Sequence, residues 1–237
     1  MTTFSAIQMK TGPDWGQNLE RLRALIEKSG DLAVAPEVCL TGFAYDRFDE
    51  AAAFGKEALQ ELLPLSQNRT VCYTQIEKEN GRFYNFAYVL HGGRVVHRQP
   101  KVKLFAFGGE TDYFTPGSME DIKIFEAGGK KMGLLICFEL RFLEIWERLK
   151  GSDIILVPAM WGRLRKRHFE QLTEALAVMN QCFVVASDSA NDDMAKSSAV
   201  ITPFGEVTRD DRKSLVSRAV DLSQIQKMRR YMNIGLA

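Results

Sequence analysis

Short apolar runs alternate along this chain with longer amphipathic stretches. Residues 19–26, 48–67 and 169–179 repeat apolar side chains at helical spacing and predict three helices. Other runs have the length and the branched residues expected of buried strands. These runs are residues 3–9, 31–37, 70–75, 131–137, 153–158 and 182–187. Strands that alternate with helices at both ends of the chain favour a sheet, or a pair of sheets, covered by helices.

Turn signals in the middle of the chain predict hairpins. Asn80-Gly81 and Gly92-Gly93 divide residues 70–98 into a meander of three antiparallel strands, and Gly128-Gly129 marks another hairpin. Residues 198–208 predict a last hairpin, residues 216–220 an edge strand, and a short basic helix follows. The predicted strands therefore form a mixed sheet arrangement, with antiparallel hairpins beside strands that alternate with helices. Because the sequence shows neither a repeat nor a linker, we expect residues 1–237 to form a single domain.

Composition narrows the class of protein. Of the 237 residues, 46% are hydrophobic and 26% are charged, which are ordinary values for a globular domain. The 31 basic and 30 acidic residues nearly cancel, so no nucleic acid partner is expected. No apolar run approaches the roughly 20 residues that span a bilayer, so no membrane partner is expected either. Residues 1–10 lack the pattern of a secretory signal.

The four cysteines, Cys39, Cys72, Cys137 and Cys182, are scattered without CxxC spacing. Zinc and iron–sulfur sites normally show closer ligand pairs. Scattered thiols in a chain without a secretory signal are typical of a reducing compartment, so the cytoplasm is the expected location.

Cys137 is the first candidate for chemistry because it ends an apolar strand directly before a further helix. The helical spacing of Phe142, Ile145, Trp146 and Leu149 predicts this helix, and Gly151 ends it. The N-terminus of a helix favours a thiolate. The alternative is a small buried side chain, which is the role of most free cysteines.

Two further extended runs end on reactive side chains, Glu37 after Pro36 and Lys103 after Pro100. A carboxylate, an ammonium and a thiol together can perform acyl transfer: the carboxylate takes the thiol proton, and the ammonium stabilises the oxyanion. Glu37 as a surface residue is the plainer alternative. A cysteine–histidine pair is a further one, although the three histidines are poorly placed for it.

The sequence resembles the nitrilase superfamily, the carbon–nitrogen hydrolases, over nearly its whole length. Five ordered blocks carry this resemblance. They are Ala35-Pro36-Glu37 with Thr41-Gly42, Lys101-Val102-Lys103-Leu104-Phe105, Gly109-Glu110 before Phe114-Thr115-Pro116-Gly117, Cys137-Phe138-Glu139-Leu140-Arg141-Phe142, and Pro158-Ala159-Met160-Trp161.

The resemblance implies an α/β (mixed α+β) fold, a four-layer α-β-β-α sandwich, without a metal or an organic cofactor. It implies Glu37 as the base, Cys137 as the nucleophile, and Lys103 with the backbone N–H of Phe138 as the oxyanion donors. Water then cleaves the thioester. Glu110 would orient Lys103 or the substrate nitrogen. Members commonly form homodimers through outer helices. Leu176 and Met179 replace an arginine and a glutamate that are frequent in the family, which puts the usual subunit packing in question.

For the substrate, Thr41-Gly42-Phe43 resembles the ω-amidase branch, which hydrolyses monoamides of dicarboxylic acids such as 2-oxoglutaramate. An N-carbamoyl amino acid hydrolase is the alternative within the family. A catalytically silent scaffold and a thiol redox protein are the alternatives from other classes. The expected pocket residues are Phe138, Ala159, Trp161, Phe43 and Tyr45, with Arg163 for a distal carboxylate. The basic run 163–167 could equally be a solvated loop.

Overall fold

The computed structural model describes residues 2–236, which build two six-stranded sheets. The first sheet runs in the order β12-β1-β2-β3-β4-β5 and the second in the order β11-β10-β9-β8-β7-β6. The strands of the first sheet are β1 (Thr2–Ile7), β2 (Leu32–Val34), β3 (Thr70–Glu79), β4 (Arg82–His91), β5 (Arg94–Pro100) and β12 (Leu215–Val220). Those of the second are β6 (Phe125–Ala127), β7 (Lys130–Leu134), β8 (Ile154–Pro158), β9 (Phe183–Ser187), β10 (Ala199–Ile201) and β11 (Val207–Arg209).

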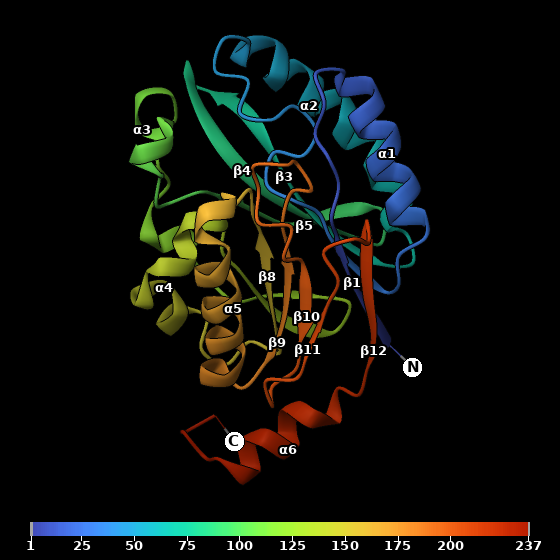
Figure 1. Ribbon diagram of the computed structural model, residues 1–237, viewed down its shortest axis with the longest axis vertical. Helices are drawn as coiled ribbons and strands as arrows, with labels where there is room; N and C mark the ends of the chain where they lie inside the picture. The colour runs from blue at the N-terminus through green and yellow to red at the C-terminus, as the bar shows by residue number, and fades with distance from the viewer. Residues whose placement is uncertain (1, 237) are drawn as a thin grey trace.

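Helices cover the outer face of each sheet, which confirms the four-layer prediction. Figure 1 shows α1 (Trp15–Glu27) and α2 (Phe48–Leu62) on one side of the sheets, and α4 (Leu143–Arg148) and α5 (Lys166–Asn180) on the other. The short α3 (Glu110–Tyr113) lies at one end, and α6 (Ser223–Tyr231) projects at the other. No helix among residues 2–236 is long and apolar enough to cross a membrane.

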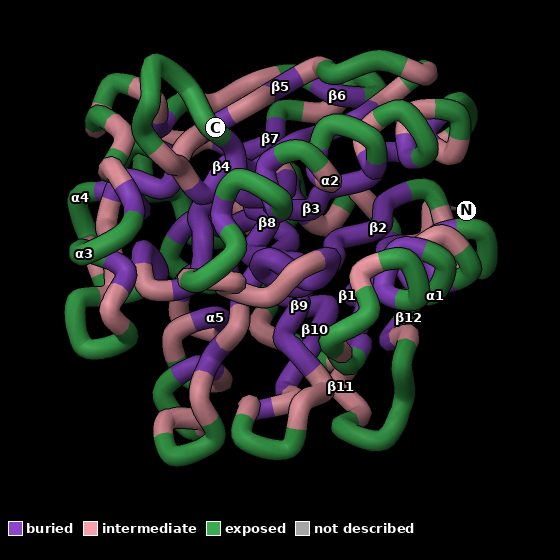
Figure 2. Tube along the Cα trace, turned by 90° about the horizontal axis from the view of Figure 1, so that it is seen from above, coloured by how far each residue is buried: buried purple, intermediate pink, exposed green. Residues whose placement is uncertain are grey.

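Side-chain alternation explains why four layers form. In β2, Leu32 and Val34 contribute to the cluster between the two sheets, whereas Ala33 faces the cluster under α1 and α2. Because consecutive side chains of a strand point to opposite faces, a strand that is apolar throughout must be covered on both sides. The buried residues accordingly fill the centre of the molecule (Figure 2).

The predicted hairpins are confirmed in register. Asn80 and Gly81 join β3 to β4, and Gly92 and Gly93 join β4 to β5. All four residues have positive φ, as tight turns of this kind require. The predicted edge strand is β12, which pairs with β1. The strand predicted for residues 31–37 is shorter than expected, since β2 ends at Val34. The chain turns away at Ala35-Pro36 and places Glu37 against the second sheet. There the backbone N–H of Glu37 binds the Ala159 carbonyl at 3.1 Å.

Candidate active site

Three buried side chains meet where strands of the first sheet end. Glu37 follows β2, Lys101 follows β5, and Glu110 begins α3. The Lys101 Nζ lies 2.7 Å from an oxygen of Glu37 and 2.7 Å from an oxygen of Glu110. The Lys101 and Glu37 side chains are 0% exposed, so this carboxylate–ammonium–carboxylate group is shielded from solvent.

The lysine of this group is Lys101, and the expectation for Lys103 is wrong. The Lys103 Nζ points away and pairs with the half-exposed Glu144 at 3.1 Å, over the ring of Phe142. Two residues earlier in the same run, Lys101 is fully buried. Consequently Glu110 holds Lys101, not Lys103.

The charge state of Lys101 follows from its neighbours. Burial alone would lower the pKa of its ammonium, but Glu37 and Glu110 raise this pKa above its ordinary value, so Lys101 is charged at neutral pH. The pKa of Glu110 is itself raised, by burial first and also by Glu37, and Lys101 opposes this shift. Two of the three Lys101 N–H groups bind these carboxylates. One N–H is left to donate to a bound molecule.

Cys137 lies beside this group, at the start of the 3₁₀ turn η4 (Cys137–Arg141). Its φ of +49° is in the left-handed region, which non-glycine residues rarely adopt and which is often found at functional sites. Burial, followed by the charge of Glu37, raises the thiol pKa well above its ordinary value. The expected helix-stabilised thiolate is therefore not present. The resting group is a thiol, and attack requires a base.

Glu37 is oriented to be that base. One of its oxygens accepts hydrogen bonds from Lys101 and from the side-chain amide of Asn85 at 2.8 Å. The other accepts the N–H of Met160 at 3.2 Å. Asn85, which lies in β4, was not among the expected site residues. Its signal was a polar amide within an apolar, aromatic strand, since a buried amide needs specific partners.

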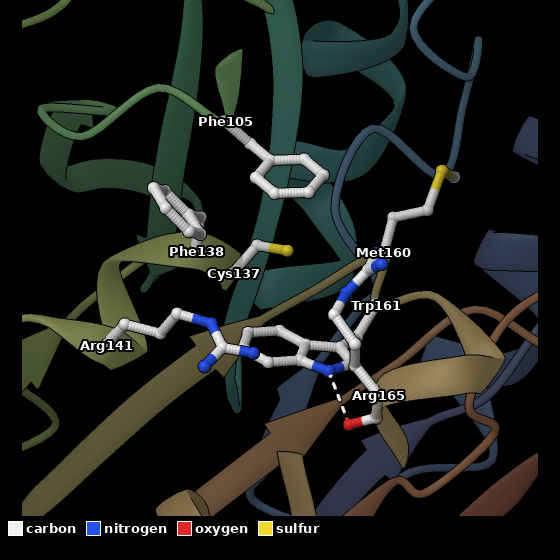
Figure 3. Close-up of a pocket in the computed structure, with 7 residues that line it drawn as sticks. All are labelled: Phe105, Cys137, Phe138, Arg141, Met160, Trp161 and Arg165. Atoms are coloured by element: carbon white, nitrogen blue, oxygen red, sulfur yellow. Dashed lines mark hydrogen bonds between the residues drawn. The ribbon is translucent and has the colours of Figure 1, made fainter. Parts of the chain in front are cut away.

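An opening of about 250 Å³ leads to the sulfur of Cys137. Figure 3 shows this sulfur pointing into the space between the rings of Phe105 and Trp161. Phe138 and Trp161 line the opening, as the sequence analysis expected, and Phe105 and Met160 complete its apolar wall.

Two guanidinium groups also line this opening. Arg141 lies over the ring of Trp161 at 4.9 Å, and Arg165 lies over that of Phe105 at 5.2 Å. Burial, followed by the charge of Arg165, lowers the pKa of Arg141. Neither side chain forms an ion pair with any residue in the described range 2–236, so an anion entering the opening would find two cations available.

The other expected pocket residues lie elsewhere. Arg163 is exposed and lines a separate surface depression with Lys166 and Asp192, so the expectation that it faces the site is wrong. Ala159 is fully buried, and it acts through its carbonyl, which binds Glu37. Phe43 and Tyr45 stack in an aromatic cluster with Tyr113 and Phe114 of the Glu110 segment and are not among the residues that line the opening.

A buried carboxylate supports the wall of the opening. Asp188 follows β9 and accepts the backbone N–H of Trp161 at 2.7 Å and that of Lys196 at 2.9 Å. Burial raises the pKa of Asp188 to about 8, although these N–H groups favour the ionised form. Asp188 thus fixes Trp161 without reaching the opening itself.

Comparison with known proteins identifies the family of this chain. The carbon-nitrogen hydrolase family model matches residues 3–230. The chain is 28% identical to the 2-oxoglutaramate amidase of Bacillus subtilis, over 90% of this chain and 88% of the relative. It is 25% identical to the omega-amidase NIT2 of Xenopus tropicalis, over 98% and 92%. The structure of Saccharomyces cerevisiae Nit3, a nitrilase superfamily member, has the same fold, with a TM-score of 0.86, 21% identity and coverage of 99% and 95%.

Proposed function

Because the chain belongs to the carbon–nitrogen hydrolase family, we propose that it hydrolyses the terminal amide of a small dicarboxylic acid monoamide, with Cys137 as nucleophile. Family and amidase relatives together identify a carbon–nitrogen hydrolase that acts on small amides. The observation that carries the mechanism is the buried ammonium of Lys101 between Glu37 and Glu110, beside a thiol. A silent scaffold would gain nothing from burying these charges, because burial of ions is costly.

In the first half of the reaction, Glu37 takes the proton of the Cys137 thiol while the sulfur attacks the amide carbon. The carbonyl oxygen gains negative charge, which the remaining N–H of Lys101 stabilises. The backbone N–H of Phe138 is the second donor, since the first N–H groups of a helical turn have no partner within the turn. Glu110 keeps Lys101 in place through its 2.7 Å contact.

In the second half, the carbon–nitrogen bond breaks, and the departing nitrogen takes the proton from Glu37 and leaves as ammonia. The product is a thioester on Cys137. Glu37 then takes a proton from water, the resulting hydroxide attacks the thioester carbonyl, and the sulfur departs and regains a proton from Glu37. The carboxylic acid is released, and the enzyme returns to its starting state.

The two arginines support an acidic substrate. Arg141 and Arg165 bring two positive charges to an opening whose other walls are aromatic. A distal carboxylate would form charge-assisted hydrogen bonds with these guanidinium groups. A neutral amide would bring no anionic group to either guanidinium. The 2-oxoglutaramate amidase relative agrees with a substrate of this class.

The test of the activity is ammonia release on a panel of ω-monoamides, N-carbamoyl amino acids, simple aliphatic amides and a nitrile. We expect release from monoamides that disappears in Cys137→Ala, which removes only the reacting sulfur. Turnover that survives in this variant would contradict the assignment of the nucleophile. Release from N-carbamoyl amino acids alone would replace the proposed substrate class.

The test of the substrate class compares Arg141→Ala and Arg165→Ala with Arg163→Ala, the matched control from the same basic run. We expect kcat/KM for a monoamide acid to fall by about 10- to 100-fold in the first two variants, the value of a charge-assisted hydrogen bond. A neutral aliphatic amide should be hydrolysed as before, and the control should be unchanged. An equal loss on acidic and neutral amides would refute the role in carboxylate binding.

We also propose that the enzyme acts in the cytoplasm as a homodimer and that residues 1–237 form one domain. The exposed apolar residues Val178 and Met179 of α5, near Phe204, support the dimer, because an uncovered apolar face is typical of an interface. Met179 is exposed and Leu176 is buried, so neither position carries the charge network expected of many family members. Sedimentation equilibrium of the purified protein would measure the mass of the assembly.

A further inference from the structure

Glu139 is a buried carboxylate whose hydrogen-bond partners within residues 2–236 are all backbone N–H groups. Its side chain is 0% exposed. One oxygen accepts the N–H of Ile136 at 2.6 Å, and the other accepts that of Val102 at 2.5 Å and, at 3.4 Å, that of Lys103. An isolated buried charge is costly, so its presence at this place needs a reason.

The two backbone segments that Glu139 joins carry the reacting groups. Ile136 directly precedes Cys137, and Val102 directly follows Lys101. Lys101 follows β5 in the first sheet, whereas Cys137 follows β7 in the second. One side chain therefore sets the spacing between the nucleophile and the ammonium across the junction of the two sheets.

The backbone of Cys137 also depends on this contact. A non-glycine residue at φ +49° persists only when its surroundings fix it there. The N–H of Glu139 binds the carbonyl of Ile136 at 3.0 Å, while the Glu139 carboxylate binds the N–H of the same residue. Ile136 is thus held on both sides, immediately before the strained residue.

We propose that ionised Glu139 is a positioning residue of the amidase, which acts by holding Cys137 against Lys101 and does not touch the substrate. This inference rests on the proposed function. Burial raises the pKa of Glu139 to about 7. The N–H groups of Ile136 and Val102 and the charge of Lys101 oppose this shift, because they favour the ionised carboxylate. Lys101 is the charged group that acts on Glu139, and it is itself paired with Glu37 and Glu110. Protonation would remove an acceptor from one of the two segments.

The experiment compares Glu139→Gln with Glu144→Gln, a matched control on the protein surface five residues after Glu139 in the sequence. A glutamine keeps the volume of Glu139 but turns an NH₂ group toward the backbone N–H of either Ile136 or Val102. We expect kcat to fall by about 100-fold, because a displacement of the reacting sulfur by about 1 Å has an effect of this size, while KM changes little. Alkylation of Cys137 by iodoacetamide should slow in parallel. In the unmodified protein the alkylation rate should show a step near pH 7, which Glu139→Gln abolishes.

Several outcomes would overturn the proposal. If Glu139→Gln matches Glu144→Gln in kcat and in alkylation rate, and only its melting temperature falls, Glu139 is merely structural. If Glu139→Gln does not fold, the pH profile of the unmodified protein decides, and the absence of a step near pH 7 refutes the role. If the unmodified protein hydrolyses no amide, the proposed function fails, whereas the alkylation measurements still decide on Glu139.

Discussion

The substitution of Lys101 by methionine, compared with the same change at Lys103, separates the buried lysine from its surface neighbour. Methionine retains most of the apolar length of lysine and removes only the charge. At position 101 this leaves Glu37 and Glu110 facing each other in a buried site without the cation that lies 2.7 Å from each. Breaking a buried ion pair in this way costs about 3–5 kcal/mol.

The expected effect on catalysis follows from the lost donor. Removal of one oxyanion donor reduces kcat by about 100- to 1000-fold in well-studied hydrolases. Lys103→Met removes a partly exposed ion pair with Glu144 and a contact with the ring of Phe142. For this variant we expect activity and stability within experimental error of the unmodified protein, because exposed ion pairs contribute little.

The assay is ammonia release at saturating monoamide, with urea unfolding followed by circular dichroism as the measure of stability. Activity is compared at a urea concentration of zero, where the folded fraction of each variant is known from the unfolding curve. If Lys103→Met abolished turnover while Lys101→Met retained it, the geometry of the site as described would be wrong. If both variants were active, a lysine would not be the oxyanion donor.

Two further predictions concern buried polar groups. Asn85→Leu removes the 2.8 Å hydrogen bond that orients Glu37. We expect kcat to fall by about 10-fold with KM unchanged, because this is the contribution of a hydrogen bond to a charged group. Unchanged kinetics would contradict this role. Glu139 and Asp188 have pKa values raised to about 7 and about 8, so the folded state binds protons more tightly than the unfolded state. The free energy of unfolding should therefore decrease as pH rises from about 5 to about 8, by on the order of 3 kcal/mol for Glu139 alone, and urea titrations at several pH values would detect it; an increase over this range would refute the reasoning.

Periodicity and turn chemistry act locally, and they predicted one sheet or a pair of sheets covered by helices, whereas the four-layer arrangement came from the resemblance to the nitrilase superfamily. Strands apolar on both faces require cover on both sides, and glycine pairs mark the hairpins. The sequence also indicated the positions of Glu37 and Cys137, since each ends an apolar strand. Such reasoning depends only on neighbouring residues, and it succeeds wherever tertiary contacts merely reinforce the local preference.

It failed where two similar residues lie close together in one run. Lys101 and Lys103 are two residues apart, so in an extended segment strand alternation places them on the same face and cannot distinguish them. The chain bends after Pro100, which buries the first lysine and exposes the second. Arg163 and Arg165 present the same difficulty, because a 3₁₀ turn directs only Arg165 into the opening.

The pairing of β1 with β12 has a consequence for the order in which the protein is made. β1 contains Phe4, Ala6 and Ile7, all buried, and its partner β12 begins only at Leu215. Until residues 215–220 leave the ribosome, β1 is the open edge of a sheet with buried side chains on both faces. Such an edge readily pairs with other chains. The protein thus keeps one unpaired apolar edge until β12 is made, when nearly all of its other strands can already have paired.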